Sequence, residues 1–353
     1  MAMVETNMSN NSVAKSCFLL AGILLSFSLN TRAEWQFQPS PTTNTSLRSV
    51  FAVSAKTVWS SGSGGVCLRT TNGGQTWENL SFPGAEKMDF RGVVAFDAQR
   101  AILMSAGEAE QGLARIYRTS DGGRHWRLVC QTWDKGVFLD GLAFWDSRNG
   151  IAFSDPLDGK WYLLKTSDGG NTWQHAKTAN LPAMLPNEAA FAAGNSSIAT
   201  LGSSKVWLAS GGADRARVFA SNDRGQTWQV RETPMPSGPT AGIFGLRFWD
   251  SKHGIAVGGD HKADHAAGDN VIITDDGGRT WRTATPTDPP GLKETVVMLP
   301  SRKLLAVGPS GTSTSVDFGM SWQRIDSSSF HAASVANGHC WAVGANGLIA
   351  TWK

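Results

Sequence analysis

Arginine side chains at recurring positions are the clearest sign of chemistry in this 353-residue sequence. A guanidinium presents a planar fork of N–H donors that matches a carboxylate or a phosphate group. Together with Asp140, Tyr162 and His261, the arginines are our candidates for binding a polar or anionic ligand or a partner protein. They lie at the ends of strand-like runs or in the polar segments between them: Arg48, Arg91, Arg115, Arg215 and Arg217.

Carboxylates in similar segments could instead perform acid–base chemistry. Glycoside hydrolysis uses two carboxyl groups about 5–10 Å apart, one acting as the acid and the other as the base or nucleophile. The candidates are Asp155, Glu188 and Asp260, and Glu188 comes just before a further strand-like run. Spacing along the chain does not fix the distance between carboxyl groups, so no catalytic residue is assigned.

Metal or cofactor chemistry is not indicated. His261 and His265 form an HxxxH pattern, but in a loop segment that does not fix their geometry. No GxGxxG follows a strand-like run, and no haem-attachment CxxCH occurs. Cys67, Cys130 and Cys340 fall in separate strand-like runs, which predicts buried free thiols, with one disulfide among them as the alternative. We therefore expect no metal and no cofactor.

A repeated motif, [ST]-x-[DN]-x-G-x-[THS]-W, identifies the elements that must hold these residues. Successive motif tryptophans are 41 to 55 residues apart, a period typical of propellers and related repeat folds. The six near-copies are TTNGGQTW (70–77), TSDGGRHW (119–126), TSDGGNTW (166–173), SNDRGQTW (221–228), TDDGGRTW (274–281) and SVDFGMSW (315–322).

Each copy lies between two strand-like runs and is predicted to form a tight connection between them. The Asp or Asn oxygen can accept hydrogen bonds from backbone N–H groups two or more residues further along. Glycine supplies a backbone conformation with positive φ, and the tryptophan is expected to pack as a large apolar anchor. The motif is therefore interpreted as structural rather than catalytic.

A second pattern between the motifs adds a strand, a polar turn and a strand, as in GLAFWDSRNGIAFSDP (141–156). With the strands that flank each motif, one repeat holds four strands, which is a propeller blade. A seventh inner pair follows Trp322, and its missing fourth strand is predicted at residues 35–39. The fold class is therefore all-β: a seven-bladed β-propeller with four-stranded blades, closed by the N-terminal strand completing the last blade.

Residues 1–33 are predicted to be a secretory signal peptide, and residues 34–353 a single propeller domain. Lys15 precedes a short apolar run (17–29), and small residues lead to a cleavage site after Ala33. We expect an exported monomer, periplasmic or extracellular, with no transmembrane span in the mature chain. The net charge of +3 gives no indication of nucleic-acid binding.

Alternate connections within a four-stranded blade fall on opposite faces of a propeller. The motifs and the FWDSRNG-type turns share one face. Variable loops on a rigid scaffold are the usual place for binding, so we place the candidate site on the other face. That face carries the charged segments 107–115, 154–160, 211–217 and 258–270.

The motif resembles the Asp-box of the bacterial neuraminidase repeat, and nearly the whole mature chain is similar to the photosystem II assembly and stability factor group and its bacterial relatives. The shared features are seven blades, the motif, and inner pairs of the form F-x-D…G-x-A-V-G. The resemblance implies a non-catalytic scaffold that binds partner proteins through a basic face, here with the five arginines named above. It also implies that the motifs lie opposite the functional face.

A glycoside hydrolase of the sialidase-like or endoglucanase-like type is the alternative that stays open. Sialidases with this repeat, by the same resemblance, use three arginines, a Tyr–Glu nucleophile pair and an Asp acid/base. The expected R-I-P sequence near the first blade is missing, and Tyr117 and Tyr162 both lie in strands that lead directly into motifs. These departures favour the binding protein over the enzyme.

Overall fold

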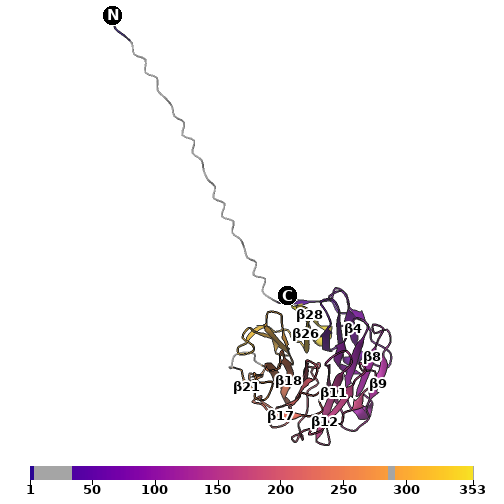
Figure 1. Cartoon of the computed structure of the whole chain (residues 1–353). Helices are drawn as coiled ribbons and strands as arrows, with labels where there is room; N and C mark the ends of the chain where they lie inside the picture. The colour runs from indigo at the N-terminus through magenta and orange to yellow at the C-terminus, as the bar shows by residue number, and fades with distance from the viewer. Residues whose placement is uncertain (4–33, 285–290, 353) are drawn as a thin grey trace. The chain divides into compact units, whose positions relative to one another are not determined.

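Seven antiparallel sheets of four strands each follow one another around a ring in the computed structural model (Figure 1). The structure describes residues 1–3, 34–284 and 291–352. The predicted secretory segment falls outside these ranges except for residues 1–3, so it remains a prediction. Within the described ranges, no helix has the length and apolar character needed to cross a membrane.

The first strand of each blade lies innermost, because these strands contact one another in a closed circle from β2 through β26 and back to β2. The innermost strands are β2 (Leu47–Ala52), β6 (Asp89–Ala95), β10 (Leu139–Phe144), β14 (Ile198–Leu201), β18 (Ala241–Phe248), β22 (Thr295–Met298) and β26 (Ala332–Ala336). The second strands are β3 (Val58–Gly62), β7 (Ala101–Ala106), β11 (Gly150–Leu157), β15 (Lys205–Ala209), β19 (Gly254–Asp260), β23 (Leu304–Gly308) and β27 (His339–Val343).

The outer half of each blade continues the same order. The third strands are β4 (Cys67–Thr70), β8 (Arg115–Thr119), β12 (Lys160–Thr166), β16 (Arg217–Ser221), β20 (Val271–Thr274), β24 (Gly311–Ser315) and β28 (Ile349–Trp352). The outermost strands are β5 (Glu78–Asn79), β9 (Arg127–Gln131), β13 (Gln174–His175), β17 (Gln229–Glu232), β21 (Arg282–Thr283), β25 (Gln323–Asp326) and β1 (Trp35–Phe37). Three short 3-10 turns complete the described elements: η1 (Ser63–Gly65), η2 (Ala109–Gln111) and η3 (Ala345–Gly347).

The ring closes through the pairing of the first and last strands, as the sequence predicts. Trp35 of β1 lies opposite Trp352 of β28 in antiparallel register. The Trp35 indole Nε1 donates to Thr312 Oγ1 of the sixth blade at 2.9 Å, and its ring packs 4.7 Å from the Phe330 ring. Closure pairs both edges of the last blade's third strand, so no backbone edge is left open there.

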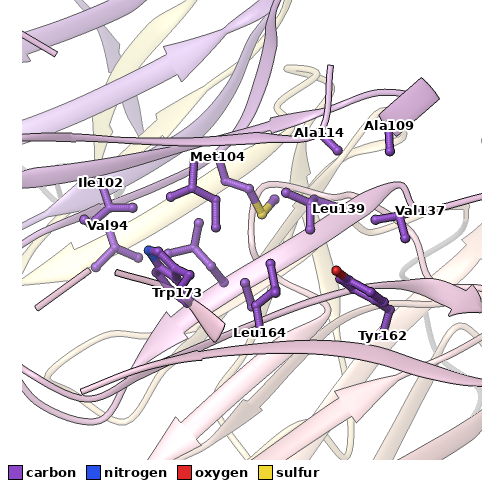
Figure 2. Packing of buried hydrophobic residues seen from close by; sticks show 13 residues of the cluster. Val94, Ile102, Met104, Ala109, Ala114, Val137, Leu139, Tyr162, Leu164 and Trp173 are labelled. Atoms are coloured by element: carbon purple, nitrogen blue, oxygen red, sulfur yellow. The ribbon is translucent and has the colours of Figure 1, made fainter. Parts of the chain in front are cut away.

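The core lies between neighbouring blades, since each sheet packs both of its faces against another sheet. Figure 2 shows the cluster between the second and third blades, where Met104 and Ile102 of β7 face Leu164 of β12 and the motif residue Trp173. Every residue of β7 is buried, as expected for a strand covered on both faces. The motif tryptophans thus anchor the blades, which confirms their predicted packing role.

Side-chain oxygens hold each motif in the same turn, illustrated by the third copy. Thr166 Oγ1 accepts the Gly170 N–H at 3.0 Å and donates to Asp168 Oδ1 at 2.9 Å. Asp168 in turn accepts the Thr172 N–H at 3.0 Å and the Thr172 hydroxyl at 2.7 Å. Partial burial acts to raise the pKa of Asp168, but these hydrogen bonds prevail and lower it to about 2. We call the face that carries the six motif turns the turn face, and the opposite face the loop face.

In each of the first three blades, a cation binds the motif turn of the next blade. Arg69 Nη1 donates to the Gly122 carbonyl at 2.8 Å, and Arg118 Nε donates to the Gly169 carbonyl at 3.1 Å. Lys165 Nζ donates to the Gly225 carbonyl at 2.9 Å. Each cation directly precedes the Thr that opens its own motif, so one short segment stabilises two neighbouring turns.

The three cysteines of the described ranges are free, as predicted. Cys67 and Cys340 are buried, and Cys130 is partly buried. Burial raises the pKa of the Cys130 thiol to about 11 and raises the pKa of the other two thiols as well. A thiol that stays protonated at neutral pH is a poor nucleophile, so these cysteines act as packing residues.

Candidate functional site

A bulge recurs near the loop-face end of four innermost strands. The extra residue is Arg48 in β2, Arg91 in β6, Asp140 in β10 and Phe244 in β18. A bulge leaves one residue out of the ladder and redirects its side chain. Arg48, Arg91 and Asp140 therefore occupy equivalent positions in their blades, and the bulge is the structural basis of that equivalence.

A cavity of about 280 Å³ lies at the centre of the loop face. Both bulge arginines, Arg48 and Arg91, line this cavity, which supports the prediction that the loop face carries the candidate site. Six of the seven blades contribute to its lining: Arg48, Arg91, residues 191–194, Phe244, His261, Glu294 and His331.

The charged side chains that line this cavity, apart from the histidines, are Arg48, Arg91 and Glu294. Arg48 makes no hydrogen bond or ion pair with any residue that the structure describes, and its Nε is buried without an acceptor. Arg91 Nε donates to Asp89 Oδ2 at 2.8 Å. His331 Nδ1 lies 3.1 Å from Glu294 Oε2. Two guanidinium groups that share one cavity attract an anion, and Arg48 has no acceptor of its own among the described residues.

Aromatic rings form the apolar part of the wall. Phe191 and Phe244 stack with their centroids 4.0 Å apart and their planes 5° from parallel. The exposed His261 ring meets both of them edge-on, at 6.0 and 6.4 Å. The cavity can therefore bind a group that combines an anionic end with a short apolar body.

The floor of the cavity is a segment of the fourth blade that crosses the axis of the ring. This axial segment, residues 188–196, belongs to the connection between β13 and β14, the longest described connection between blades. Asn195 Oδ1 accepts the Leu142 N–H of the third blade at 3.0 Å, and Ser196 Oγ lies 2.6 Å from Thr295 Oγ1 of the sixth. At Gly194, φ is +61° and a Cβ would lie 2.5 Å from the Arg48 carbonyl oxygen, so only glycine fits.

A buried ion pair fixes the start of the axial segment. Arg217 Nε donates to Glu188 Oε1 at 2.8 Å, its Nη2 binds Oε2, and Ser210 Oγ donates to Oε1 at 2.6 Å. The Glu188 side chain is 0% exposed and that of Arg217 is 8% exposed. The structure thus brings together a predicted carboxylate and a predicted arginine, but as partners of each other.

The predicted place of Glu188 in the chain is wrong in one respect. Strand β14 begins at Ile198 rather than directly after Glu188. The residues between them leave the sheet because they form the axial segment, where they bond to other blades. The apolar run EAAFAA therefore looks like a strand in the sequence although only an isolated bridge, Ala189 with Gly211, forms there.

Asp155 and Asp140 form a pair of carboxyl groups beside the axial segment. Burial raises the pKa of Asp155 to about 6, although the Ala190 N–H, which it accepts at 3.0 Å, lowers it. Burial and the Asp155 carboxylate raise the pKa of Asp140 well above its ordinary value, against the opposing effect of Arg91. Neither aspartate lines the loop-face cavity, so the pair does not face its contents.

Asp260 and Arg215, also predicted as candidates, lie at the surface and bond to residues near them. Asp260 accepts the Thr240 hydroxyl at 2.7 Å and the Lys262 N–H at 2.8 Å, and these bonds lower its pKa. Arg215 forms an exposed ion pair with Glu232. Neither side chain reaches the cavity lining.

Two other predicted binding residues lie in the second and third blades. Arg115 donates from Nη1 to the Tyr117 hydroxyl at 3.1 Å, away from the cavity lining. Tyr162 is buried in the cluster of Figure 2, and its hydroxyl donates to Asp134 Oδ2 at 2.9 Å. The part of the chain that the structure describes contains no group of three His, Cys, Asp or Glu side chains placed to hold a metal ion.

Among the lining residues with aromatic or ionisable side chains, sequence reasoning missed four: Phe191, Phe244, Glu294 and His331. A signal for the last three was present, because each directly precedes the small residue that begins the regular part of its inner strand. Arg48 and Arg91 occupy the same position. Phe191 carries no such signal, since its place follows from the path of the axial segment.

Comparison with known proteins identifies the fold. Neither protein-family models nor curated proteins match the sequence. Among solved structures, YCF48 bound to D1 peptide is 15% identical with a TM-score of 0.60, over 90% of this chain and 94% of that one. The WD40 β-propeller domain of Doa1 is 12% identical with a TM-score of 0.60, over 91% and 97%. At these sequence identities, the two similarities show the propeller fold alone.

Proposed function

We propose that this chain is an exported, non-catalytic propeller that binds a partner protein through the loop-face cavity. The cavity takes up an acidic side chain or a chain-terminal carboxylate of the partner. The observation that carries the proposal is Arg48, a guanidinium without a protein partner among the described residues, in a central cavity that also holds Arg91.

The size and composition of the cavity support this class of ligand. A volume of about 280 Å³ lies near the lower end of the range for small-ligand sites, so it suits one side chain or one chain end. The stacked Phe191 and Phe244 rings offer an apolar contact for the residue that carries the anion. YCF48, a protein of the same fold, has been solved with a bound peptide, and the resemblance of the mature chain to photosystem II assembly and stability factors points the same way.

Immobilised peptides that differ in the carboxylate groups they carry test the proposal. One set ends in a free carboxylate and the other in an amide, each with and without internal Asp and Glu. We expect binding to favour the carboxylate-bearing peptides and to weaken at least about tenfold when Arg48→Gln and Arg91→Gln are combined, because charge-assisted hydrogen bonds are lost. Arg231→Gln, at an exposed position of β17, is the matched control and should bind as the parent does.

Equal binding of carboxylate-bearing peptides and of amidated peptides without Asp or Glu, or full binding by the double variant, would overturn this assignment. Export is tested separately, by locating the mature chain after expression with and without residues 1–33. A chain retained inside the cell in both cases would count against the secretory prediction alone.

A glycoside hydrolase remains the second candidate because of one observation, the raised pKa of Asp155 next to Asp140. A carboxyl group whose pKa is raised towards neutral pH can act as a general acid. Chromogenic glycosides, assayed with the parent chain and with Asp155→Asn, test this function. Turnover that the substitution abolishes would establish it, and absence of turnover across neutral, amino and acidic sugars would remove it.

A further inference from the structure

A second cavity, of about 340 Å³, lies at the turn-face end of the same inner strands. All seven innermost strands contribute to its lining, and so do Gly194, Asn195 and Ser196 of the axial segment. Gly194 also lines the loop-face cavity. The axial segment therefore separates two cavities that share one axis.

A ring of equivalent residues surrounds this second cavity, one from each blade. Each pairs across its strand with a large buried apolar residue of the second strand, such as Ile255 opposite Arg247. Arg247 is the charged member of the ring. The other six are uncharged: Phe51, Val94, Ala143, Ala199, Val297 and Ser334.

Arg247 has no protein counter-charge in the ranges that the structure describes. It forms no hydrogen bond and no ion pair there, and its side chain remains exposed. The surrounding wall nevertheless removes part of its hydration, which lowers its pKa. The carboxylate of Asp146, which also lines the cavity, is occupied by the Arg148 and Asn149 N–H groups of its own turn, each at 2.8 Å.

The fold does not need a cation at this position. Six blades place small or apolar side chains there and keep the same strand pairing, so Val, Ala or Ser would serve the fifth blade equally well. A confined guanidinium loses hydration without gaining a protein partner. An anionic ligand would supply the missing interaction.

A second donor lies on the same ring. Ser334 Oγ accepts the Ala52 N–H at 3.0 Å, and its own hydroxyl hydrogen is left to donate. The aromatic rings of Phe51, Phe144 and Trp145 form part of the wall. The cavity thus combines a guanidinium, a hydroxyl donor and apolar surface, which suits an oxyanion attached to a short apolar body.

We propose that the turn-face cavity is a separate binding site for a small organic oxyanion, a carboxylate or phosphate, with Arg247 as its anchor and Ser334 as a second donor. The site lies on the face opposite the loop-face cavity, and it does not depend on the function proposed for that cavity.

Titration calorimetry with three probes of similar size tests this site: benzoate, phenyl phosphate and uncharged benzamide. We expect saturable binding of at least one anion below about 1 mM, and none of benzamide up to about 10 mM. Preference between benzoate and phenyl phosphate distinguishes the two oxyanion classes. Arg247→Gln should weaken binding at least about tenfold, and Arg247→Lys, which keeps the charge without the fork, should weaken it less.

Two controls keep the outcome interpretable. Arg231→Gln, at an exposed position of β17 outside both cavities, should leave the affinity unchanged, whereas binding that is lost in Arg48→Gln and kept in Arg247→Gln would move the site to the loop face. Thermal unfolding shows whether each variant is folded, and Arg247→Lys tests the site if Arg247→Gln is not. The proposal would be overturned if the parent chain showed no saturable anion binding, or if both Arg247 variants bound the anion with the affinity of the parent. Arg247 would then be a solvated arginine.

Discussion

The turn face and the loop face are built from the same seven blades, but in opposite ways. On the turn face, one sequence pattern recurs six times, and each copy makes the same bond from a glycine N–H to its first Thr or Ser, as in Gly170 with Thr166 and Gly278 with Thr274. On the loop face, no two connections share a sequence, and one of them leaves its blade to cross the axis.

The two faces therefore differ in how their stability is distributed: over six similar turns on one face, and on one segment on the other. Each motif turn is one of six similar units, so the loss of one leaves the others in place. Among the connections that the structure describes, the axial segment has no counterpart, and a single buried ion pair, Arg217 with Glu188, fixes its start. Within the described ranges, Arg48 and Arg247 at the centre have no protein partner, and the axial segment leaves each of them in its own cavity.

The largest expected effect comes from breaking the ion pair on the loop face. Glu188→Gln keeps the shape of the side chain but leaves Arg217 buried without a counter-charge. We expect a loss of about 3–5 kcal/mol in the free energy of unfolding, because an uncompensated buried charge is strongly destabilising. Denaturant unfolding monitored by tryptophan fluorescence measures it.

Glu232→Gln provides the matched control in the same blade. It removes the partner of Arg215 from an exposed ion pair, and such pairs contribute less than about 1 kcal/mol. Similar losses in the two variants would show that the axial segment is not held by its buried pair.

A smaller effect is expected from one motif turn. Asp276 accepts the Arg279 N–H at 2.8 Å, the Thr280 N–H at 3.0 Å and the Thr280 hydroxyl at 2.7 Å. Asp276→Ala should lower the free energy of unfolding by about 1–2 kcal/mol, the usual loss for a side chain that caps backbone donors. Asp223→Ala, in the preceding blade, should cost the same, and unequal losses would show that the turns are not equivalent units.

Acid should weaken the turn face first. Partial burial opposes the shift, but hydrogen bonds lower the pKa of Asp168, Asp223 and Asp276 to about 2. Their ordinary values lie near 4, so the stability they contribute is complete above about pH 4 and is lost as pH falls towards 2. Melting temperatures between pH 5 and 2 measure this slope, which should be shallower in Asp276→Ala. An unchanged slope in that variant would contradict the assignment.

The smallest effect is expected on the loop face, with the opposite dependence on pH. Because burial raises the pKa of Asp155 to about 6, its ionisation opposes folding, and stability is lost as pH rises through that value. Asp155→Asn should therefore be more stable than the parent at pH 8, by about 1 kcal/mol after allowance for its partial exposure. The two should melt alike near pH 4, and a destabilised variant at pH 8 would contradict the raised pKa.

Much of the fold could be predicted because its determinants are local. The motif encodes a turn within eight residues, and Trp35 stands in the register of a strand that follows a motif, so blade number and closure could both be inferred. Arg48 and Arg91 could be placed in the candidate site by alignment of the inner strands. The pairing of Arg217 with Glu188 could not, because the two residues meet only when residues 176–197 fold back over the blade.

Sequence by itself determined the repeat, the seven blades, the closing strand and the face on which the charged loops lie, because hydrogen bonds within short segments and strand alternation decide these features. Only the tertiary structure decided which charges have partners. Ring closure brings seven strands around one axis, and the path of the axial segment between them buries Glu188 with Arg217 and leaves Arg48 and Arg247 in separate cavities. Pairing depends on distances across the ring, and no local pattern in the chain encodes those distances.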